Sequence, residues 1–185
     1  VTIPFSMSIF RWLPDRGVLL ARPLGLLIVA WFTWLGTSLG LWDFTRTSIA
    51  ASIGILALAS CGFALADKKL ILIRLRAHWR YLINVEILFL VAFTIFLVIR
   101  AANPDLWHPW RGGEKPMDLA YITAIVKSTN MPPFDPWYSG GFLNYYYFGH
   151  FIIATIIKLT RIVPEVAYNL AIALIFALTV TSSFS

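Results

Sequence analysis

The sequence predicts an all-α integral membrane protein: a multi-pass bundle of transmembrane helices with a long external loop that carries a short interfacial helix. Three observations predict this class. Hydrophobic residues make up 59% of the chain and charged residues only 13%, whereas charged residues are about 25% of a typical soluble domain. Apolar runs of bilayer length recur along the chain. A polar segment from Trp107 to His150 separates two groups of these runs.

Five apolar runs have the length expected of membrane-spanning helices. They cover residues 24–41, 49–66, 82–99, 142–159 and 166–185. The first three form an N-terminal membrane region over 1–99, and the last two form a second region over 142–185. Between them lies the expected external loop, 100–141. Because the chain begins with Val and stops inside its last apolar run, we expect it to be part of a larger protein.

The charges predict how the chain is oriented. Segment 11–22 has three bases and one acid, segment 67–81 has five bases and one acid, and segment 158–165 has two bases and one acid. If every run crosses the membrane, these segments share one side, while 43–46 and the loop 100–141 share the other. The positive-inside rule then places the basic segments in the cytoplasm and the long loop outside the plasma membrane. This bias also explains the net charge of +6. We do not expect nucleic-acid binding, because the sequence has no basic strip within a soluble unit.

The loop itself contains one helical pattern. Pro116 suits a first helical position, and apolar or small residues then recur at helical spacing. These are Met117, Ala120, Tyr121, Ala124 and Ile125. We therefore expect a short amphipathic helix over 116–128, lying in the membrane interface.

A Pro- and Gly-rich turn and a tyrosine-rich segment follow that helix. Residues 130–141 include three prolines and two glycines, which favour an irregular turn. In the next run, Tyr146 and His150 are four residues apart and share a helical face. The three tyrosines Tyr145, Tyr146 and Tyr147 fit an aromatic belt at the interface. His150 lies deeper, where an ionisable group needs either a partner or a watery cavity.

Two acids make the loop a candidate for chemistry. Asp118 falls in the first turn of the expected helix, and Glu114 lies just before it. Two carboxylates this close can bind a divalent cation such as Mg²⁺ or Mn²⁺, orient a sugar or phosphate, or act as acid and base. The structural alternative is that Asp118 stabilises its helix by roughly 0.3–1 kcal/mol. In that case, Glu114 simply pairs with Lys115 or Arg111.

Several segments together carry a resemblance to a known family. They are Arg22–Gly25, Asn103–Pro109, Gly112–Asp118, Pro132–Gly141 and Asn144–Gly149. These long motifs resemble the "YYY" family of large multi-pass membrane proteins, which is known chiefly from Chloroflexota and archaea and named for its triple tyrosine. The resemblance runs from about Phe10 to the end of the chain.

A weaker resemblance extends to the C-type glycosyltransferase superfamily (GT-C), which uses polyprenyl-phosphate sugar carriers at the outer membrane face. Residues 99–151 are similar to those transferases in their order of helix, loop acid, interfacial helix and Pro-rich turn. This resemblance implies that Asp118 is the catalytic carboxylate of the loop. The chain departs from the pattern because at least two apolar runs precede that core. It also has Asn144 and the tyrosines where His-Pro-Pro or Lys-Pro-Pro is common.

The resemblance implies a membrane-embedded glycosyltransferase with a lipid-linked sugar donor. Arg111 and Lys115 would hold the donor phosphate, and Asp118, with Glu114, would accept a proton from the acceptor hydroxyl. The remaining expected substrate contacts are Asn144, Tyr145, Tyr146, Tyr147 and His150. The alternative is a non-catalytic subunit of a larger membrane complex, whose outer loop docks other subunits. Membrane lipids are expected partners in either case.

Overall fold

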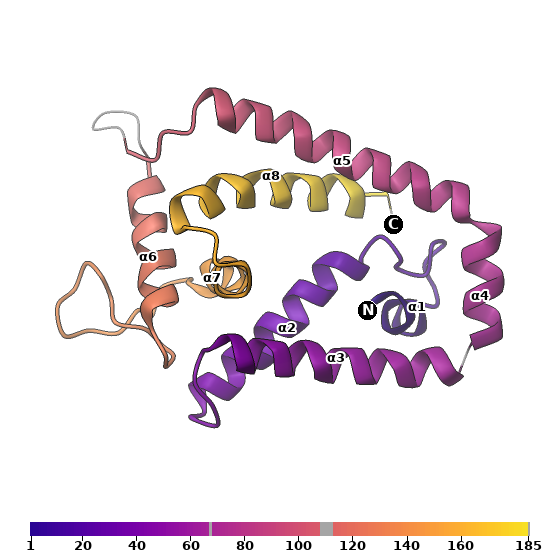
Figure 1. Cartoon of the computed structure of the whole chain (residues 1–185), viewed down its shortest axis with the longest axis horizontal. Helices are drawn as coiled ribbons and strands as arrows, with labels where there is room; N and C mark the ends of the chain where they lie inside the picture. The colour runs from indigo at the N-terminus through magenta and orange to yellow at the C-terminus, as the bar shows by residue number, and fades with distance from the viewer. Residues whose placement is uncertain (67, 108–112, 185) are drawn as a thin grey trace. The chain divides into compact units, whose positions relative to one another are not determined.

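The structure, a computed structural model, describes residues 1–66, 68–107 and 113–184 (Figure 1). Within these ranges all regular secondary structure is helical, and the only strand-like pairing is an isolated bridge between Phe134 and Phe142. The helices are α1 (Ile3–Ile9), α2 (Ala21–Ser38), α3 (Arg46–Ala66), α4 (Lys68–Ala77), α5 (Trp79–Ala102), α6 (Lys115–Lys127), α7 (Phe148–Thr160) and α8 (Pro164–Ser182). The all-α prediction is therefore confirmed.

Among the described residues, three helices are long and apolar enough to cross a membrane: α3, α5 and α8. They contain most of the predicted runs 49–66, 82–99 and 166–185. α2 covers most of the predicted run 24–41 but is not one of the three. It begins earlier than the run, at Ala21, and so includes the charged Arg22.

The predicted run 142–159 forms a shorter helix than expected. α7 has 13 residues, and at 1.5 Å per residue it is about 20 Å long, whereas a bilayer core is about 30 Å thick. Residues 142–147 lie outside the helix. α7 is accordingly a short apolar helix and not one of the candidate membrane spans.

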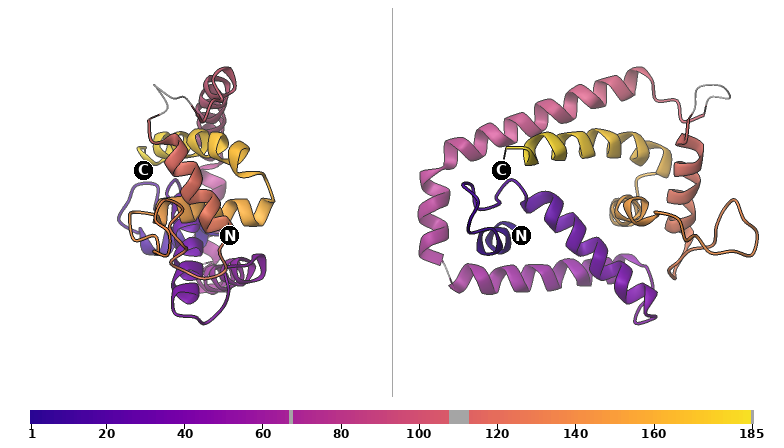
Figure 2. Two further views of the ribbon diagram at one scale, coloured as in Figure 1. Left: turned by 90° about the vertical axis from the view of Figure 1, so that its left-hand side faces the viewer. Right: turned by 180° about the vertical axis from the view of Figure 1, so that it is seen from behind.

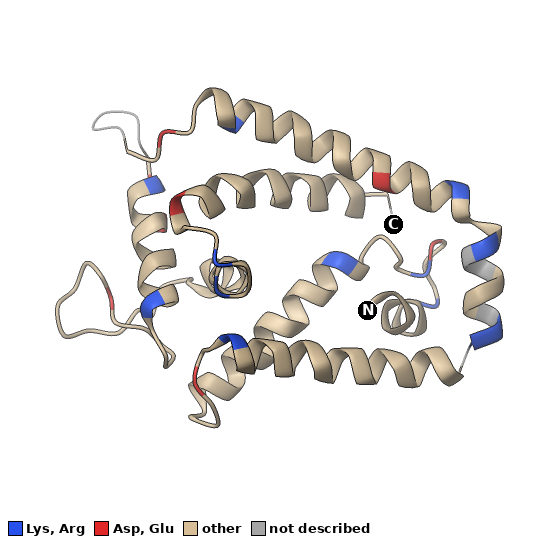
Figure 3. Ribbon diagram, viewed as in Figure 1, with Lys and Arg blue, Asp and Glu red and all other residues tan. Residues whose placement is uncertain are grey.

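The basic segment 67–81, expected as a loop, contains the helix α4. Its ten residues include Lys68, Lys69 and Arg76, and two of its apolar side chains, Leu72 and Ile73, are exposed. Figure 3 shows the basic residues along α4. A short basic helix with exposed apolar side chains is typical of a segment that lies in a membrane interface.

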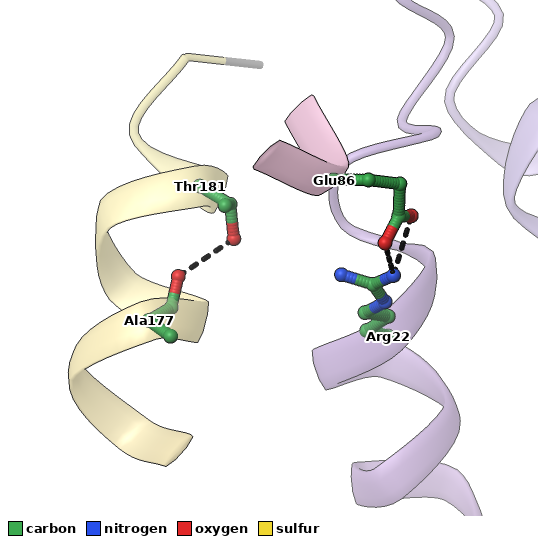
Figure 4. Close-up of polar contacts among 4 residues, drawn as sticks. All are labelled: Arg22, Glu86, Ala177 and Thr181. Atoms are coloured by element: carbon green, nitrogen blue, oxygen red, sulfur yellow. Dashed lines mark hydrogen bonds and ion pairs between the residues drawn. The ribbon is translucent and has the colours of Figure 1, made fainter. Parts of the chain in front are cut away.

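The chain divides into two compact units. The first comprises residues 1–28, 53–99 and 172–185, and the second comprises 29–52 and 100–171. In the first unit, Arg22 of α2 forms an ion pair with Glu86 of α5 (Figure 4). The Arg22 guanidinium also lies 4.4 Å from the centre of the Phe89 ring. Glu86 lies about two turns into α5, and this ion pair supplies the cation that an acid within an apolar helix needs.

The second unit contains the candidate site. Its apolar core joins α6, α7 and α8 through five buried residues: Ile122, Ile153, Ile157, Ala167 and Ala171. α6 and α7 lie side by side in the views of Figures 1 and 2. The Lys158 ammonium near the end of α7 donates hydrogen bonds to the backbone carbonyls of Phe44 and Ser128. Lys158 thus ties α7 to the segment before α3 and to the end of α6.

Candidate functional site

The Asp118 carboxylate is held by side chains from two other helices. Its Oδ1 lies 3.1 Å from His150 Nε2, in α7. Its Oδ2 accepts a hydrogen bond of 3.2 Å from the Tyr168 hydroxyl, in α8. The Asp118 side chain keeps 24% of its surface exposed, and that of His150 keeps 15%. The structure therefore gathers an acid, an imidazole and a phenol into one partly accessible cluster.

The packing of α6 explains why Asp118 faces this cluster. Asp118, Tyr121, Ile122 and Ile125 are spaced at i, i+3, i+4 and i+7 and lie on one helical face. The last three of them are buried. Burying this face against the neighbouring helices brings the Asp118 carboxylate to His150 and Tyr168. The predicted apolar stripe on this helix shares only Tyr121 and Ile125 with the observed face.

The opposite face of α6 lines a groove of about 680 Å³. Ala120, Thr123 and Ala124 are among the helix residues that line it. Exposed aromatic side chains border it, among them Trp107 and Trp137. Ala120 and Ala124 belong to the apolar stripe that the sequence predicts for this helix. In the structure they line the groove, because α7 and α8 pack against the other face of the helix.

The His150 ring is enclosed by aromatic rings. Tyr121 meets it edge-on, with ring centres 5.7 Å apart, and Tyr146 lies nearly parallel to it at 6.4 Å. A proton on Nε2 suits its contact with Asp118, because a carboxylate oxygen accepts hydrogen bonds. Nδ1, the other ring nitrogen, is buried with no hydrogen-bond partner among the described residues. A buried polar atom without a partner is uncommon and marks this ring as one able to take a further ligand.

The three tyrosines have different surroundings. The Tyr147 hydroxyl accepts a hydrogen bond of 2.8 Å from the Trp34 indole nitrogen, which fixes it against α2. Tyr145 and Tyr146 are exposed, and their ring centres are 3.9 Å apart. The hydrogen bond with Tyr145 is the main cause that raises the pKa of Tyr146 to about 12. Tyr146 is therefore a neutral phenol near pH 7, suited to hydrogen bonding and ring stacking.

The other predicted site residues are less closely associated with Asp118. Glu114 is exposed and lies just before α6 without capping it through its side chain. The Lys115 ammonium is 3.4 Å from the Asp105 carbonyl oxygen, and Asn144 is exposed. The predicted phosphate ligand Arg111 lies outside the described residues. Of the predicted residues, the structure thus brings together Asp118, His150 and Tyr146.

Three residues of this region were not predicted: Tyr168, Asn169 and Arg100. Tyr168 lies in α8, whose sequence suggests only a membrane span. Arg100, in the last turn of α5, donates through Nε to Asn169 Oδ1 at 2.8 Å, and Asn169 is the residue after Tyr168. The adjacent polar pair Tyr168 and Asn169, near the start of an apolar run, is the signal by which sequence reasoning could have found this contact.

A resident metal ion has little support from the side chains. The described residues contain no group of three or more His, Cys, Asp or Glu side chains that could hold one. A cation bound at Asp118 would therefore need further oxygen ligands, such as substrate phosphate and water, as Mg²⁺ commonly takes. The expected Mg²⁺ or Mn²⁺ stays a prediction.

Comparison with known proteins adds one finding. A family model described as "Uncharacterized membrane protein (DUF2298)" matches residues 28–185. The match covers most of the chain and includes Asp118, His150 and Tyr168. No curated protein and no solved structure matches the chain.

Proposed function

We propose that this chain, which belongs to the DUF2298 family of uncharacterized membrane proteins, is part of a membrane-embedded glycosyltransferase. In this proposal the donor is a sugar linked to a polyprenyl phosphate, and Asp118 is the general base. The observation that carries the proposal is the Asp118 carboxylate, which His150 and Tyr168 hold while part of its surface remains exposed.

The contacts of Asp118 suit it to accept a proton. An ionised carboxylate offers about four acceptor positions on its two oxygens. His150 and Tyr168 use one position on each oxygen. The remaining positions can accept the proton of an acceptor hydroxyl, and the two hydrogen bonds fix the direction in which the carboxylate points. Orientation of this kind is an established source of catalytic rate.

The proposed transfer step balances as follows. The oxygen of the acceptor hydroxyl attacks the anomeric carbon of the donor, and its proton passes to Asp118. The bond between the anomeric carbon and the donor phosphate oxygen breaks, and the phosphate leaves with the electron pair. Arg111 and Lys115 would stabilise the charge that develops on that phosphate.

The tyrosines support a sugar substrate. Tyr145 and Tyr146 are exposed and lie against each other, and Tyr146 also stacks on His150. Flat aromatic faces give a sugar ring an apolar surface to contact. Their hydroxyls can donate hydrogen bonds to sugar oxygens.

We also propose that the chain is a member of the YYY family with a GT-C-like core. This proposal rests on the motifs Asn103–Pro109, Gly112–Asp118 and Asn144–Gly149.

The experiment is a comparison of Asp118→Asn with the matched control Asp135→Asn in the full-length protein. Both substitutions remove one carboxylate, and Asp135 lies in the Pro-rich turn. Purified protein in nanodiscs is given polyprenyl-phosphate sugars and simple glycoside acceptors, and release of polyprenyl phosphate is measured. We expect Asp118→Asn to lose at least about 100-fold in rate and Asp135→Asn to stay within about threefold of the wild type.

The transferase proposal fails if Asp118→Asn, still monodisperse and folded, keeps the wild-type rate. It also fails if the wild type releases polyprenyl phosphate no faster than protein-free nanodiscs, whichever sugar the carrier bears.

The groove on α6 favours a second candidate, a non-catalytic subunit of a membrane complex. Trp107, Phe134 and Trp137 line it with 68%, 67% and 62% of their surface exposed, and exposed aromatic residues are enriched at protein interfaces. For this candidate, Trp137→Ala would reduce recovery of partner subunits from native membranes, whereas Asp118→Asn would not. The transferase proposal expects the opposite sensitivity in the release assay.

A further inference from the structure

A pocket in the first unit combines apolar walls with basic groups. Its volume is about 260 Å³. Met7, Val18, Leu82 and Phe184 supply apolar lining, and Arg16 and His78 supply basic groups. We propose that this pocket binds an anionic glycerophospholipid, with the headgroup phosphate at Arg16 and the start of an acyl chain against the apolar residues.

The backbone at Arg16 is the first argument for a ligand. Arg16 has a φ of 54°, in the left-handed region, and the next residue, Gly17, has a φ of 69°. A residue other than glycine rarely adopts this conformation, which costs of order 1 kcal/mol and often marks a functional position. The Asp15 carboxylate maintains the turn by accepting hydrogen bonds of 2.9 Å from the Gly17 and Leu19 amides.

The side chain of Arg16 is the second argument. It lines the pocket and is partly buried, yet its guanidinium makes no hydrogen bond or ion pair with any of the residues that the structure describes. The only acid lining the pocket among those residues is Asp15, whose oxygens are engaged by the two backbone amides. A guanidinium in this setting can bind a phosphate with two parallel hydrogen bonds.

The charge of the unit is the third argument. The residues of the first unit include eight Lys and Arg but three Asp and Glu, whereas those of the second include seven and six. Several of the eight lie on α4 (Figure 3). Basic segments beside a membrane attract anionic lipids. The apolar lining distinguishes the expected occupant from a free anion, because phosphate alone would leave that surface exposed to water.

The test measures which lipids the full-length protein retains. Protein in nanodiscs of equal phosphatidylglycerol and phosphatidylcholine is released into mild detergent, and bound lipid is counted by native mass spectrometry. We expect the wild type to retain phosphatidylglycerol in preference. Arg16→Asn removes the charge with a residue that tolerates the left-handed backbone, and we expect it to lower that preference by about fivefold. Arg16→Lys should keep most of it.

The matched control is Arg76→Asn, which removes a charge from exposed α4 outside the pocket and should leave the preference unchanged. Equal losses in Arg16→Asn and Arg76→Asn would overturn the proposal, because they would indicate diffuse attraction to the surface. Equal retention of the two lipids by the wild type would also overturn it, as would displacement of phosphatidylglycerol by millimolar inorganic phosphate. None of these outcomes bears on Asp118, so this inference and the transferase proposal can fail separately.

Discussion

At the scale of single residues, the contacts of Asp118 can serve both structure and chemistry. His150 and Asp118 lie 32 positions apart in the sequence and meet through one contact. Tyr168 comes from a further helix and meets the second carboxylate oxygen. Each contact on its own can be structural, since a carboxylate that joins three helices stabilises their packing. A catalytic role requires in addition that the carboxylate is accessible to substrate, and the 24% of the Asp118 side chain that is exposed meets this requirement.

Substitution of Tyr168 separates these contributions. Tyr168→Phe removes one hydrogen bond to a charged acceptor, and we expect it to lower the free energy of unfolding by about 1.5–3 kcal/mol. The matched control Tyr138→Phe removes the hydroxyl of a tyrosine that is 71% exposed and should change this free energy by less than about 0.5 kcal/mol. Reversible unfolding of both variants in mixed detergent, followed by tryptophan fluorescence, would check this. Equal effects of the two substitutions would mean that the hydrogen bond between Tyr168 and Asp118 does not stabilise the fold.

At the scale of elements, a helix could be predicted where the residues of its own segment favour it through their spacing or hydropathy. The helix predicted over 116–128 occurs as α6, because Pro116 and the following residues favour it by themselves. The run 142–159 was overestimated for an equally physical reason. Phe142 and Leu143 are apolar, but the Leu143 amide donates a hydrogen bond of 2.8 Å to the Pro133 carbonyl. This segment is therefore bound to the Pro-rich turn and does not form part of the helix.

The contacts between elements were not predictable from the sequence. Asp118 and His150 were each identified, but their pairing depends on how α6 packs against α7. Tyr168 was missed because hydropathy treats its surroundings as one apolar run. The face of α6 that is buried could not be predicted, because Ala120 and Ala124 fit either face of a helix and only the packing of α7 and α8 selects one.

The turn that precedes α7 provides a test at this scale. Leu143 is fully buried, and the rings of Phe134 and Phe142 stack with centres 4.9 Å apart. We expect Leu143→Ala to lower the free energy of unfolding by about 2–5 kcal/mol, the usual cost of truncating a buried leucine. Leu41→Ala, at an exposed position, is the control and should cost less than about 1 kcal/mol. A small effect at Leu143 would show that this segment does not form the buried turn.

At the scale of the whole molecule, the short α7 changes the expected topology. The orientation predicted from the sequence requires that every apolar run crosses the membrane, which places 158–165 with the cytoplasmic segments. Yet Lys158 binds the carbonyls of Phe44 and Ser128, both in segments expected outside. Arg100 and Asn169 likewise join the end of α5 to the start of α8. We therefore propose that α7 begins and ends on the outer side and that α8 is the next span.

Cysteine labelling tests this topology directly. In a Cys61→Ala background, single cysteines replace Val163, just before α8, and Ser139, in the Pro-rich turn. We expect a membrane-impermeant maleimide to label both in intact cells, because α7 returns to the side from which it started. Lys69→Cys, on α4, is separated from the loop by the span α5 and should be labelled only after the membrane is permeabilised. If Val163→Cys instead behaves like Lys69→Cys, residues 142–160 cross the membrane, and the contacts that hold His150 and Lys158 beside the outer loop cannot form as described. The positive-inside bias would then again include 158–165, so this one comparison decides between the two topologies.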